Sequence, residues 1–155
     1  MPNDRETRFM EQALMLAEQA ADIGEVPVGC VVVLGERIVG RGYNRREIDQ
    51  RALAHAEILA IDEACGALRG WRLCGCDLFV TLEPCPMCAG AIINARLDQV
   101  FFAARDPKAG ALVSRIDLFE WGFNHHPEIH EGLLAERAAA LLSDFFATRR
   151  AQKKR

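Results

Sequence analysis

Residues 78–104, LFVTLEPCPMCAGAIINARLDQVFFAA, contain two apolar runs joined by a segment of helical character. The runs at 78–82 and 100–104 are short and rich in branched or aromatic side chains, which is typical of buried strands. Between them, Pro84-Cys85-Pro86 predicts the start of a helix that continues through Asn94. This connection is long enough for the crossover between two parallel strands, so we expect a strand–helix–strand unit.

The segments before this unit predict a helix and a hairpin. Apolar residues recur at helical spacing over 9–21, with charged residues between them and Gly24 just beyond, which indicates an amphipathic first helix. An apolar run rich in β-branched residues covers 28–34, and residues 37–42 follow after Gly35-Glu36. That pattern is typical of a hairpin in which glycine leads a two-residue turn.

Helical spacing returns over 54–64 and again from about 133 to 150. The last helix carries four apolar residues on one face, namely Leu134, Ala138, Leu141 and Phe145. A short strand is expected at 128–131. Because a hairpin is followed by strands that alternate with helices, we predict an α/β fold, a three-layer sandwich with a mixed sheet between helices.

The composition indicates one globular domain. Half of the 155 residues are hydrophobic, which is enough for one hydrophobic core. The chain is short for two domains, so we expect residues 1–155 to form a single domain. No stretch approaches the roughly 18 apolar residues of a membrane span, and nothing marks export or organelle targeting, so we expect no membrane association and a cytoplasmic location. Six cysteines in such a chain favour metal ligands or buried thiols over disulfides.

The charge is distributed unevenly along the chain. The net charge is −3, but residues 149–155 contain five positive charges and no negative one. Taking those five away leaves about −8 on residues 1–148. A basic end on an acidic body permits a local phosphate-binding patch. The same pattern is also typical of a solvated, frayed terminus.

Three residues have the pattern of a catalytic zinc site. Cys85 and Cys88 are three residues apart at the predicted start of a helix, so both sulfurs project from one face at the positive end of the helix dipole, which favours the thiolate. His55, which opens another predicted helix, is the best third ligand among the four histidines. One histidine and two cysteines leave the fourth position of zinc for water, as catalytic sites require.

Glu57 follows His55 by two residues. Residues two apart on an ideal helix point to nearly opposite sides, so both side chains reach one site only if His55 occupies the frayed first position. There, Glu57 can take the proton that a zinc-activated water releases and deliver it to a ring nitrogen and then to departing ammonia. We therefore expect Glu57 to be the catalytic acid and base.

Each part of this pattern has a plainer interpretation when taken alone. Cys-x-x-Cys can be two core thiols or a redox pair, and a single histidine is often structural. Together, His-x-Glu and Pro-Cys-x-x-Cys form the joint signature of the zinc nucleobase deaminases. The remaining cysteines, Cys30, Cys65, Cys74 and Cys76, are expected to be packing or partly exposed thiols, the last two in a turn before a strand.

With these residues identified, the chain resembles the bacterial tRNA adenosine deaminase family from about Phe9 to the last helix. The likeness rests on a series of motifs in order: VPVG at 26–29, GYN at 42–44, AHAE at 54–57, TLEPC at 81–85, MCAGA at 87–91, ARDPK at 104–108 and LLSDFF at 141–146. The resemblance implies a cytidine deaminase-like fold with a five-stranded mixed sheet. It also implies hydrolysis of the wobble adenosine in a tRNA anticodon stem-loop to inosine, by a homodimer with one Zn²⁺ per subunit.

The resemblance implies roles for further residues. Asn44 corresponds to a base-reading asparagine, whose amide can hydrogen-bond a purine in a bidentate manner, although the residues alone would equally allow a turn role. Val28 and Leu82 correspond to pocket walls. Contacts with RNA are implied for two loop residues and for the end of the last helix: Asp106, Lys108, Phe145, Phe146, Arg149 and Arg150.

Two other functions stay open on the residues themselves. The same zinc site serves free guanine, cytosine or nucleosides, and the shape of the pocket decides among them. A zinc-stabilised RNA-binding or subunit-interaction module would close the metal with four protein ligands, and a carboxylate such as Glu57 beside an open ligand position argues against it. The segment 120–128, with His125 and His126, departs from the family pattern and has no assigned role.

Overall fold

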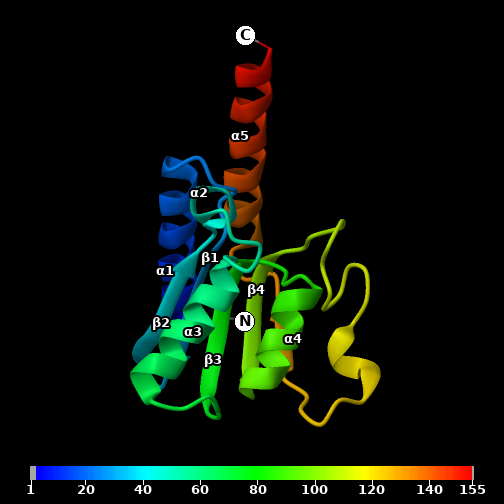
Figure 1. Ribbon diagram of the computed structural model, residues 1–155. Helices are drawn as coiled ribbons and strands as arrows, with labels where there is room; N and C mark the ends of the chain where they lie inside the picture. Colours follow the sequence, from blue (N-terminus) through cyan, green and yellow to red (C-terminus); the bar gives the residue numbers. More distant parts are fainter. Residues whose placement is uncertain (1–2, 155) are drawn as a thin grey trace.

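A mixed sheet of five strands forms the middle layer of the structure (Figure 1). The computed structural model describes residues 3–154, so the predictions that include residues 1, 2 and 155 lie in part outside the described residues. The strands are β1 (Gly29–Leu34), β2 (Arg37–Tyr43), β3 (Cys76–Leu82), β4 (Gln99–Ala104) and β5 (Glu128–Glu131).

The strand order is β2-β1-β3-β4-β5. Strand β1 runs antiparallel to β2 and β3, whereas β3, β4 and β5 are parallel to one another. The helix between β3 and β4 supplies the crossover that their parallel pairing needs. The predicted strand–helix–strand unit, the hairpin and the five-stranded mixed sheet are all confirmed.

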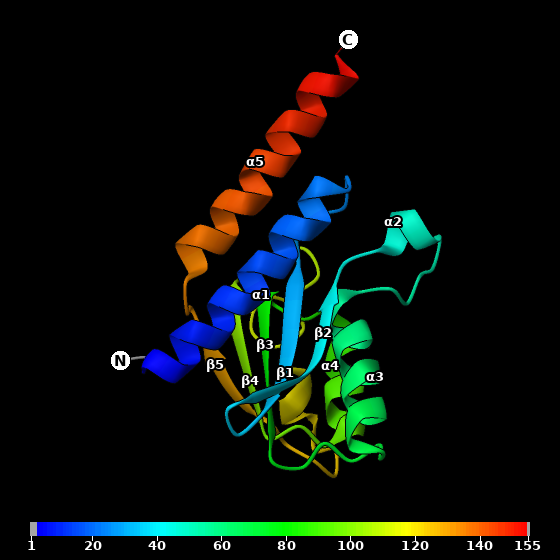
Figure 2. The same cartoon turned by 90° about the vertical axis from the view of Figure 1, so that its left-hand side faces the viewer.

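Helices cover both faces of the sheet (Figures 1 and 2). They are α1 (Asp4–Asp22), α2 (Arg46–Asp49), α3 (Ala56–Leu68), α4 (Pro86–Ala95), the 3-10 helix η1 (Leu118–Trp121) and α5 (Ala135–Lys153). Helices α1 and α5 lie side by side on one face, and α3 and α4 lie on the other. This arrangement is the predicted three-layer α/β/α sandwich. Within residues 3–154, no helix combines the length and the apolar character that crossing a membrane would require.

The central strand β1 contributes to two cores. Val31 and Val33 pack on the α1 side, whereas Cys30 and Val32 pack on the side of α3 and α4. Successive side chains of a strand point to opposite faces, so a strand covered on both sides is apolar at every position. This burial explains why the strand segments appear in the sequence as continuous apolar runs.

The helix boundaries differ from the predictions at both ends of the chain. Helix α1 begins earlier than expected because Asn3 and Glu6 form a capping box. Helix α5 begins later, at Ala135, because Leu134 has a left-handed backbone with φ 58°. The prediction that Leu134 is helical is therefore wrong, but Leu134 packs against the same core as Leu141 and the buried Ala138, as expected for the apolar face.

The cysteines behave largely as expected. All six lie in the described part of the chain and are free thiols. Cys30 is buried in β1 and Cys74 is exposed. Cys76 was placed before the strand by prediction, which is wrong: it is the first residue of β3 and is fully buried.

Glycine at position 42 lets β2 approach α3 closely. A Cβ atom on Gly42 would collide with the carbonyl oxygen of Ala56, which belongs to the first turn of α3. We expect Gly42→Ala to lower the free energy of unfolding by about 1–3 kcal/mol, because backbone atoms must shift to relieve the overlap. Urea denaturation measures this change.

Gly66, on the helix that Gly42 approaches, provides the matched control. It lies inside α3, and a Cβ atom there would meet no atom within 4 Å. Gly66→Ala should therefore raise stability by up to about 1 kcal/mol through helix propensity. Equal effects of the two substitutions would refute the claim that close approach of β2 and α3 requires glycine.

Candidate active site

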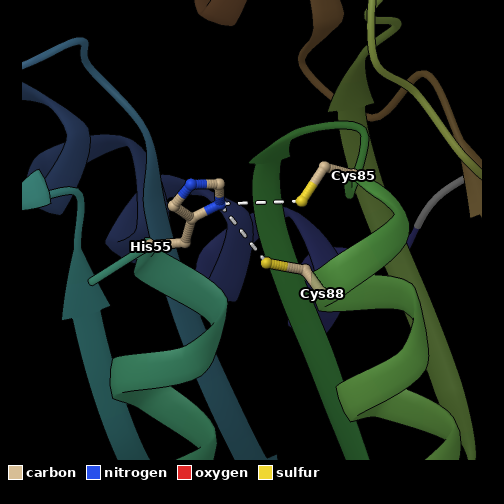
Figure 3. Close-up of side chains that lie close together, drawn as sticks. All are labelled: His55, Cys85 and Cys88. Atoms are coloured by element: carbon tan, nitrogen blue, oxygen red, sulfur yellow. Dashed lines mark hydrogen bonds between the residues drawn. The ribbon is translucent and has the colours of Figure 1, made fainter. Parts of the chain in front are cut away.

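The candidate metal ligands come from the starts of two helices on the same face of the sheet (Figure 3). His55 is the N-cap of α3, with an extended backbone at φ −80° and ψ 152°. Cys85 is the N-cap of α4, where Pro86 takes the first helical position, and Cys88 lies in the first turn. The sequence placed His55 at the frayed first position of the helix; in the structure it is the N-cap, one residue before the first helical position, and both His55 and Glu57 line the same pocket.

The three side chains converge. His55 Nδ1 lies 3.6 Å from Cys85 Sγ and 3.5 Å from Cys88 Sγ. Zinc at its usual distances of about 2.0 Å from nitrogen and 2.3 Å from sulfur, in tetrahedral geometry, would separate the nitrogen from each sulfur by about 3.5 Å. The donor set and its spacing therefore fit zinc. Within residues 3–154, His55, Cys85 and Cys88 form the one group of three or more His, Cys, Asp or Glu side chains whose ligand atoms lie close enough together to hold a metal ion.

The two thiols have different acidities. The pKa of Cys85 is lowered to about 4, first by the hydrogen bond from Cys88 and then by the bond to His55, against the opposing effect of burial. The pKa of Cys88 is raised by that same hydrogen bond and by burial. Zinc binds cysteine as the thiolate, so both thiols would release their protons when the metal binds.

Glu57 is a buried carboxyl group in the first turn of α3. It is 4% exposed. Burial raises the pKa of Glu57 to about 7, with nearby Cys85 adding to the increase and His55 opposing it. A carboxyl group with a pKa near neutrality can both accept and donate a proton at neutral pH, which is the property expected of a general acid and base.

A pocket of about 220 Å³ opens beside these residues. Its lining includes His55, Glu57 and Cys85 together with the predicted substrate residues Val28, Asn44, Leu82 and Asp106. Pockets for drug-sized ligands are usually about 300–1,000 Å³, so the volume of this pocket is that of a site for a small ring system.

The Asn44 amide is held in place at the end of β2. Its Nδ2 donates to the Val26 carbonyl at 3.3 Å, and its Oδ1 accepts from the Arg46 amide at 3.2 Å. These bonds fix the plane of the amide while leaving one N–H and one lone pair of the oxygen available. The turn role and the base-reading role weighed from the sequence are therefore compatible in one residue.

The other predicted RNA residues lie away from this pocket. Lys108 is exposed on the loop after β4, and it is not part of the pocket lining. On α5, the Phe145 and Phe146 rings pack edge to face at 5.4 Å, and the Arg149 guanidinium lies 5.0 Å from the Phe145 ring centre. Arg150 is exposed on the same helix.

Helix α5 is nevertheless tied to the pocket side of the molecule. Its carboxy-terminal part projects beyond the rest of the fold at the end where α3 and α4 begin (Figure 1). Arg149 Nη2 lies 3.5 Å from the Gly24 carbonyl, two residues before Val26 in the pocket wall. His125, in contrast, bonds to the Leu97 carbonyl at 2.7 Å, just after α4 ends.

Sequence reasoning missed two charged residues of the pocket, Arg46 and Glu83. Glu83 was quoted only as a letter of the TLEPC motif, yet it is 2% exposed and accepts several hydrogen bonds. Burial would raise the pKa of Glu83, but the hydrogen bonds from Ser114, Asp106 and Val113 outweigh it and lower the pKa. The sequence signal that could have revealed Glu83 is an acidic residue directly after a predicted buried strand, between Leu82 and Pro84.

Comparison with known proteins identifies the family. A family model described as MafB19-like deaminase matches residues 3–150. The chain belongs to this deaminase family. The chain is 48% identical over 147 residues to a tRNA-specific adenosine deaminase of Bacillus subtilis strain 168, covering 94% of this chain and 91% of the relative. It is 45% identical to a tRNA-specific adenosine deaminase of Agrobacterium fabrum, covering 93% of this chain and 95% of the relative.

A solved structure supports the same assignment. It comes from biochemical and structural studies of A-to-I editing by tRNA:A34 deaminases at the wobble position of transfer RNA. The deaminase superposes on it with a TM-score of 0.84 and 45% sequence identity, covering 88% of this chain and 99% of that chain. The predicted family and the cytidine deaminase-like fold are both confirmed.

Proposed function

We propose that this protein hydrolyses the wobble adenosine of a transfer RNA anticodon to inosine. The observation that supports it most directly is the convergence of His55, Cys85 and Cys88 beside the buried Glu57, in a chain whose relatives are tRNA-specific adenosine deaminases. In the reaction, water adds its oxygen to C6 of adenine, the bond from C6 to the amino nitrogen breaks, and ammonia leaves. No oxidant or reductant is consumed.

The residues divide the chemistry between them. His55, Cys85 and Cys88 would hold one zinc ion per subunit, and that ion would supply a water molecule activated for attack at neutral pH. Glu57 accepts a proton from the attacking water, passes it to N1 of the ring, and later protonates the departing amine. Asn44 offers its free amide groups to the purine and holds C6 within reach of attack.

The pocket and the basic helix suggest how RNA is accepted. A pocket of about 220 Å³ takes the flipped base between Val28 and Leu82, while the ribose and phosphates stay outside. Arg149, Arg150 and Lys153 at the end of α5 then face the phosphates of the anticodon stem-loop, with Phe145 and Phe146 on the same helix. Asp106 in the pocket wall and the exposed Lys108 beside it contact the anticodon loop.

The remaining parts of the proposal concern the state of the protein. Residues 1–155 act as one deaminase domain, and two copies form a homodimer with one zinc ion each. A transfer RNA substrate is consistent with a cytoplasmic location. Size-exclusion chromatography with light scattering tests the dimer, and elemental analysis tests the zinc content.

An inosine assay tests the function directly. Zinc-loaded protein is incubated with an anticodon stem-loop that carries adenosine at the wobble position, and parallel reactions contain free guanine, cytosine, adenosine or a stem-loop with guanosine there. We expect inosine from the adenosine stem-loop alone. Turnover of free bases at comparable kcat/KM would instead support the small-molecule alternative, and a lack of inosine with zinc-loaded protein would refute the proposal.

Truncation after Thr148 tests the role of the basic end. It removes five positive charges, of which Arg149, Arg150 and Lys153 belong to the end of α5. We expect KM for the stem-loop to rise at least about tenfold, with a weaker dependence of kcat/KM on salt, because fewer counterions are released on binding. We expect kcat to change little, since the residues of the pocket are untouched.

A double variant on β2 serves as the charge control. Arg37→Ala and Arg41→Ala remove two exposed positive charges far along the chain from α5. This variant should keep the KM and the salt dependence of the intact protein. An unchanged KM in the truncated protein would rule out phosphate contacts by the end of α5.

A further inference from the structure

Glu83 is a buried carboxylate in the pocket wall, between β3 and Cys85. It is 2% exposed, and no arginine, lysine or histidine is among its hydrogen-bond partners. A buried charge without an ion-pair partner needs hydrogen-bond donors to compensate for the loss of water. The donors that fulfil this need come from one segment of the chain, the loop of residues 106–114.

Five donors from this loop point at the two carboxylate oxygens of Glu83. The amide of Asp106 and the hydroxyl of Ser114 donate to Oε1, the former at 3.0 Å. The amides of Leu112, Val113 and Ser114 donate to Oε2 at 3.2, 2.8 and 2.8 Å. The carboxylate therefore holds both ends of the loop at once.

Gly110 makes room for this arrangement. It is buried in the middle of the loop, and a Cβ atom there would overlap the carboxylate of Glu83. The loop can wrap around the charge only while this position lacks a side chain. The Ala111 amide also donates to the carbonyl of Pro84 at 2.9 Å, so the loop is bonded to the residue that follows Glu83 as well.

The loop reaches the pocket through its first residues. Asp106 and Ala109 line the pocket. The Asp106 side chain accepts hydrogen bonds from the amides of Lys108 and Ala109 at 3.1 and 3.2 Å. The position of Asp106 therefore determines the positions of these two residues. Asp106 itself is held by its amide bond to Glu83. The carboxylates of Glu83 and Asp106 together thus hold the part of the pocket wall that Asp106 and Ala109 form.

We propose that Glu83 is a positioning residue: its carboxylate anchors the loop of residues 106–114 and thereby sets how the RNA substrate is accepted. The part that concerns RNA rests on the proposed function. The part that concerns the loop rests only on the contacts above. Glu83 does not carry protons in the reaction, because both of its oxygens are saturated with donors from the protein.

Glu83→Gln tests the anchor with little change of shape. Three backbone amides face Oε2, so the amide oxygen of glutamine should take that side. The NH2 group then faces the Asp106 amide, which loses its acceptor, whereas the Ser114 hydroxyl can turn to accept. We therefore expect the Asp106 end of the loop to open first, while the end near Ser114 stays bound.

Limited trypsin digestion detects this opening without any activity measurement. Cleavage after Lys108 should be at least about tenfold faster in Glu83→Gln, because loss of a hydrogen bond to a charged group raises the open population. Cleavage after Arg115, beyond the other end, should change less than about threefold on the same argument. Cleavage after Lys108 at the original rate would overturn the anchoring role.

Two further variants complete the digestion experiment. Asp77→Asn alters another largely buried carboxylate, at the opposite end of β3, where it accepts from Gln99 and pairs with Arg5. It should leave cleavage after Lys108 unchanged, and faster cleavage would show a general effect of stability. Gly110→Ala keeps the charge but pushes the loop away from it, so it should also speed cleavage after Lys108, and it tests the anchor even if Glu83→Gln does not fold.

Steady-state kinetics on the stem-loop test the second part. We expect Glu83→Gln to raise KM at least about fivefold, to change kcat less, and to keep one zinc ion per chain, because the pocket wall moves while Glu57 and the metal ligands do not. A merely destabilised protein would lose active fraction and hence kcat. An unchanged KM together with faster digestion would overturn the role in RNA acceptance. If the parent protein makes no inosine, the proposed function fails, and digestion alone decides the anchor.

Discussion

Replacing Glu57 by glutamine is expected to lower the single-turnover rate of inosine formation by at least about 1,000-fold. The amide has nearly the same shape but cannot accept and return a proton, and general acid and base catalysis contributes about 10²–10⁴-fold for each such transfer. Glu57 is expected to serve more than one transfer, from water to the ring and to the leaving amine. Zinc content should stay at one ion per chain, because Glu57 is not one of the three converging ligands.

Glu63→Gln is the matched control for this experiment. Glu63 lies on the same helix, is exposed, and accepts only from the Arg41 amide at 3.2 Å. Its substitution should leave the rate within about twofold of the parent protein, as expected for surface changes away from the site. If Glu57→Gln turned over at a rate near that of Glu63→Gln, the proton-carrying role would have to be assigned elsewhere.

The candidate metal site was predictable because its residues lie at helix ends that the sequence marks clearly. Proline at the first position of α4 places Cys85 at the cap and Cys88 one turn further on. The requirement that His55 and Glu57 share a site predicted a frayed first position for His55, and the structure has it one residue earlier, as the N-cap with an extended backbone. Local rules were sufficient here because each pair is close in sequence.

The loop anchored by Glu83 was not predictable in the same way. Its five donors are 23–31 residues further along the chain, and four of them are backbone amides, which every residue except proline possesses. No residue pattern therefore signals the contact. Gly110 in the loop and Glu83 after an apolar strand are the two features of the sequence that point to this contact, and both have common alternative explanations.

The same contrast holds for the fold. Strands β3 and β4 are buried on both faces and were visible in the sequence as short apolar runs, and the prolines at the start of α4 marked the helix between them. The start of α5 depends instead on Leu134, a leucine in a left-handed conformation that its type disfavours. The segment with η1 lacks a period because its core residues, Phe119 and the partly buried Leu118, are adjacent and come from one short turn of 3-10 helix.

Cys88→Ser is expected to abolish zinc binding at stoichiometric metal and, with it, detectable inosine formation. The side chain of Cys88 is fully buried, and a hydroxyl there is a much weaker zinc ligand than a thiolate. The parent protein should gain about 2.7 kcal/mol of stability at zinc concentrations 100 times Kd, and this gain should be absent in the variant. Melting curves with and without a chelator, combined with elemental analysis, measure both effects.

Cys74→Ser separates ligand loss from thiol loss. Cys74 is exposed and lies outside the converging group, so its substitution should leave zinc content, zinc-dependent stabilisation and activity intact. The comparison matters because the remaining pair, His55 and Cys85, could hold zinc only with two open positions, which is one more than a catalytic site of this type provides. A Cys88→Ser protein that still carried one tightly held zinc ion and still formed inosine would show that the metal lies elsewhere. The geometry of His55, Cys85 and Cys88 would then be structural, with the two thiols hydrogen-bonded to the imidazole.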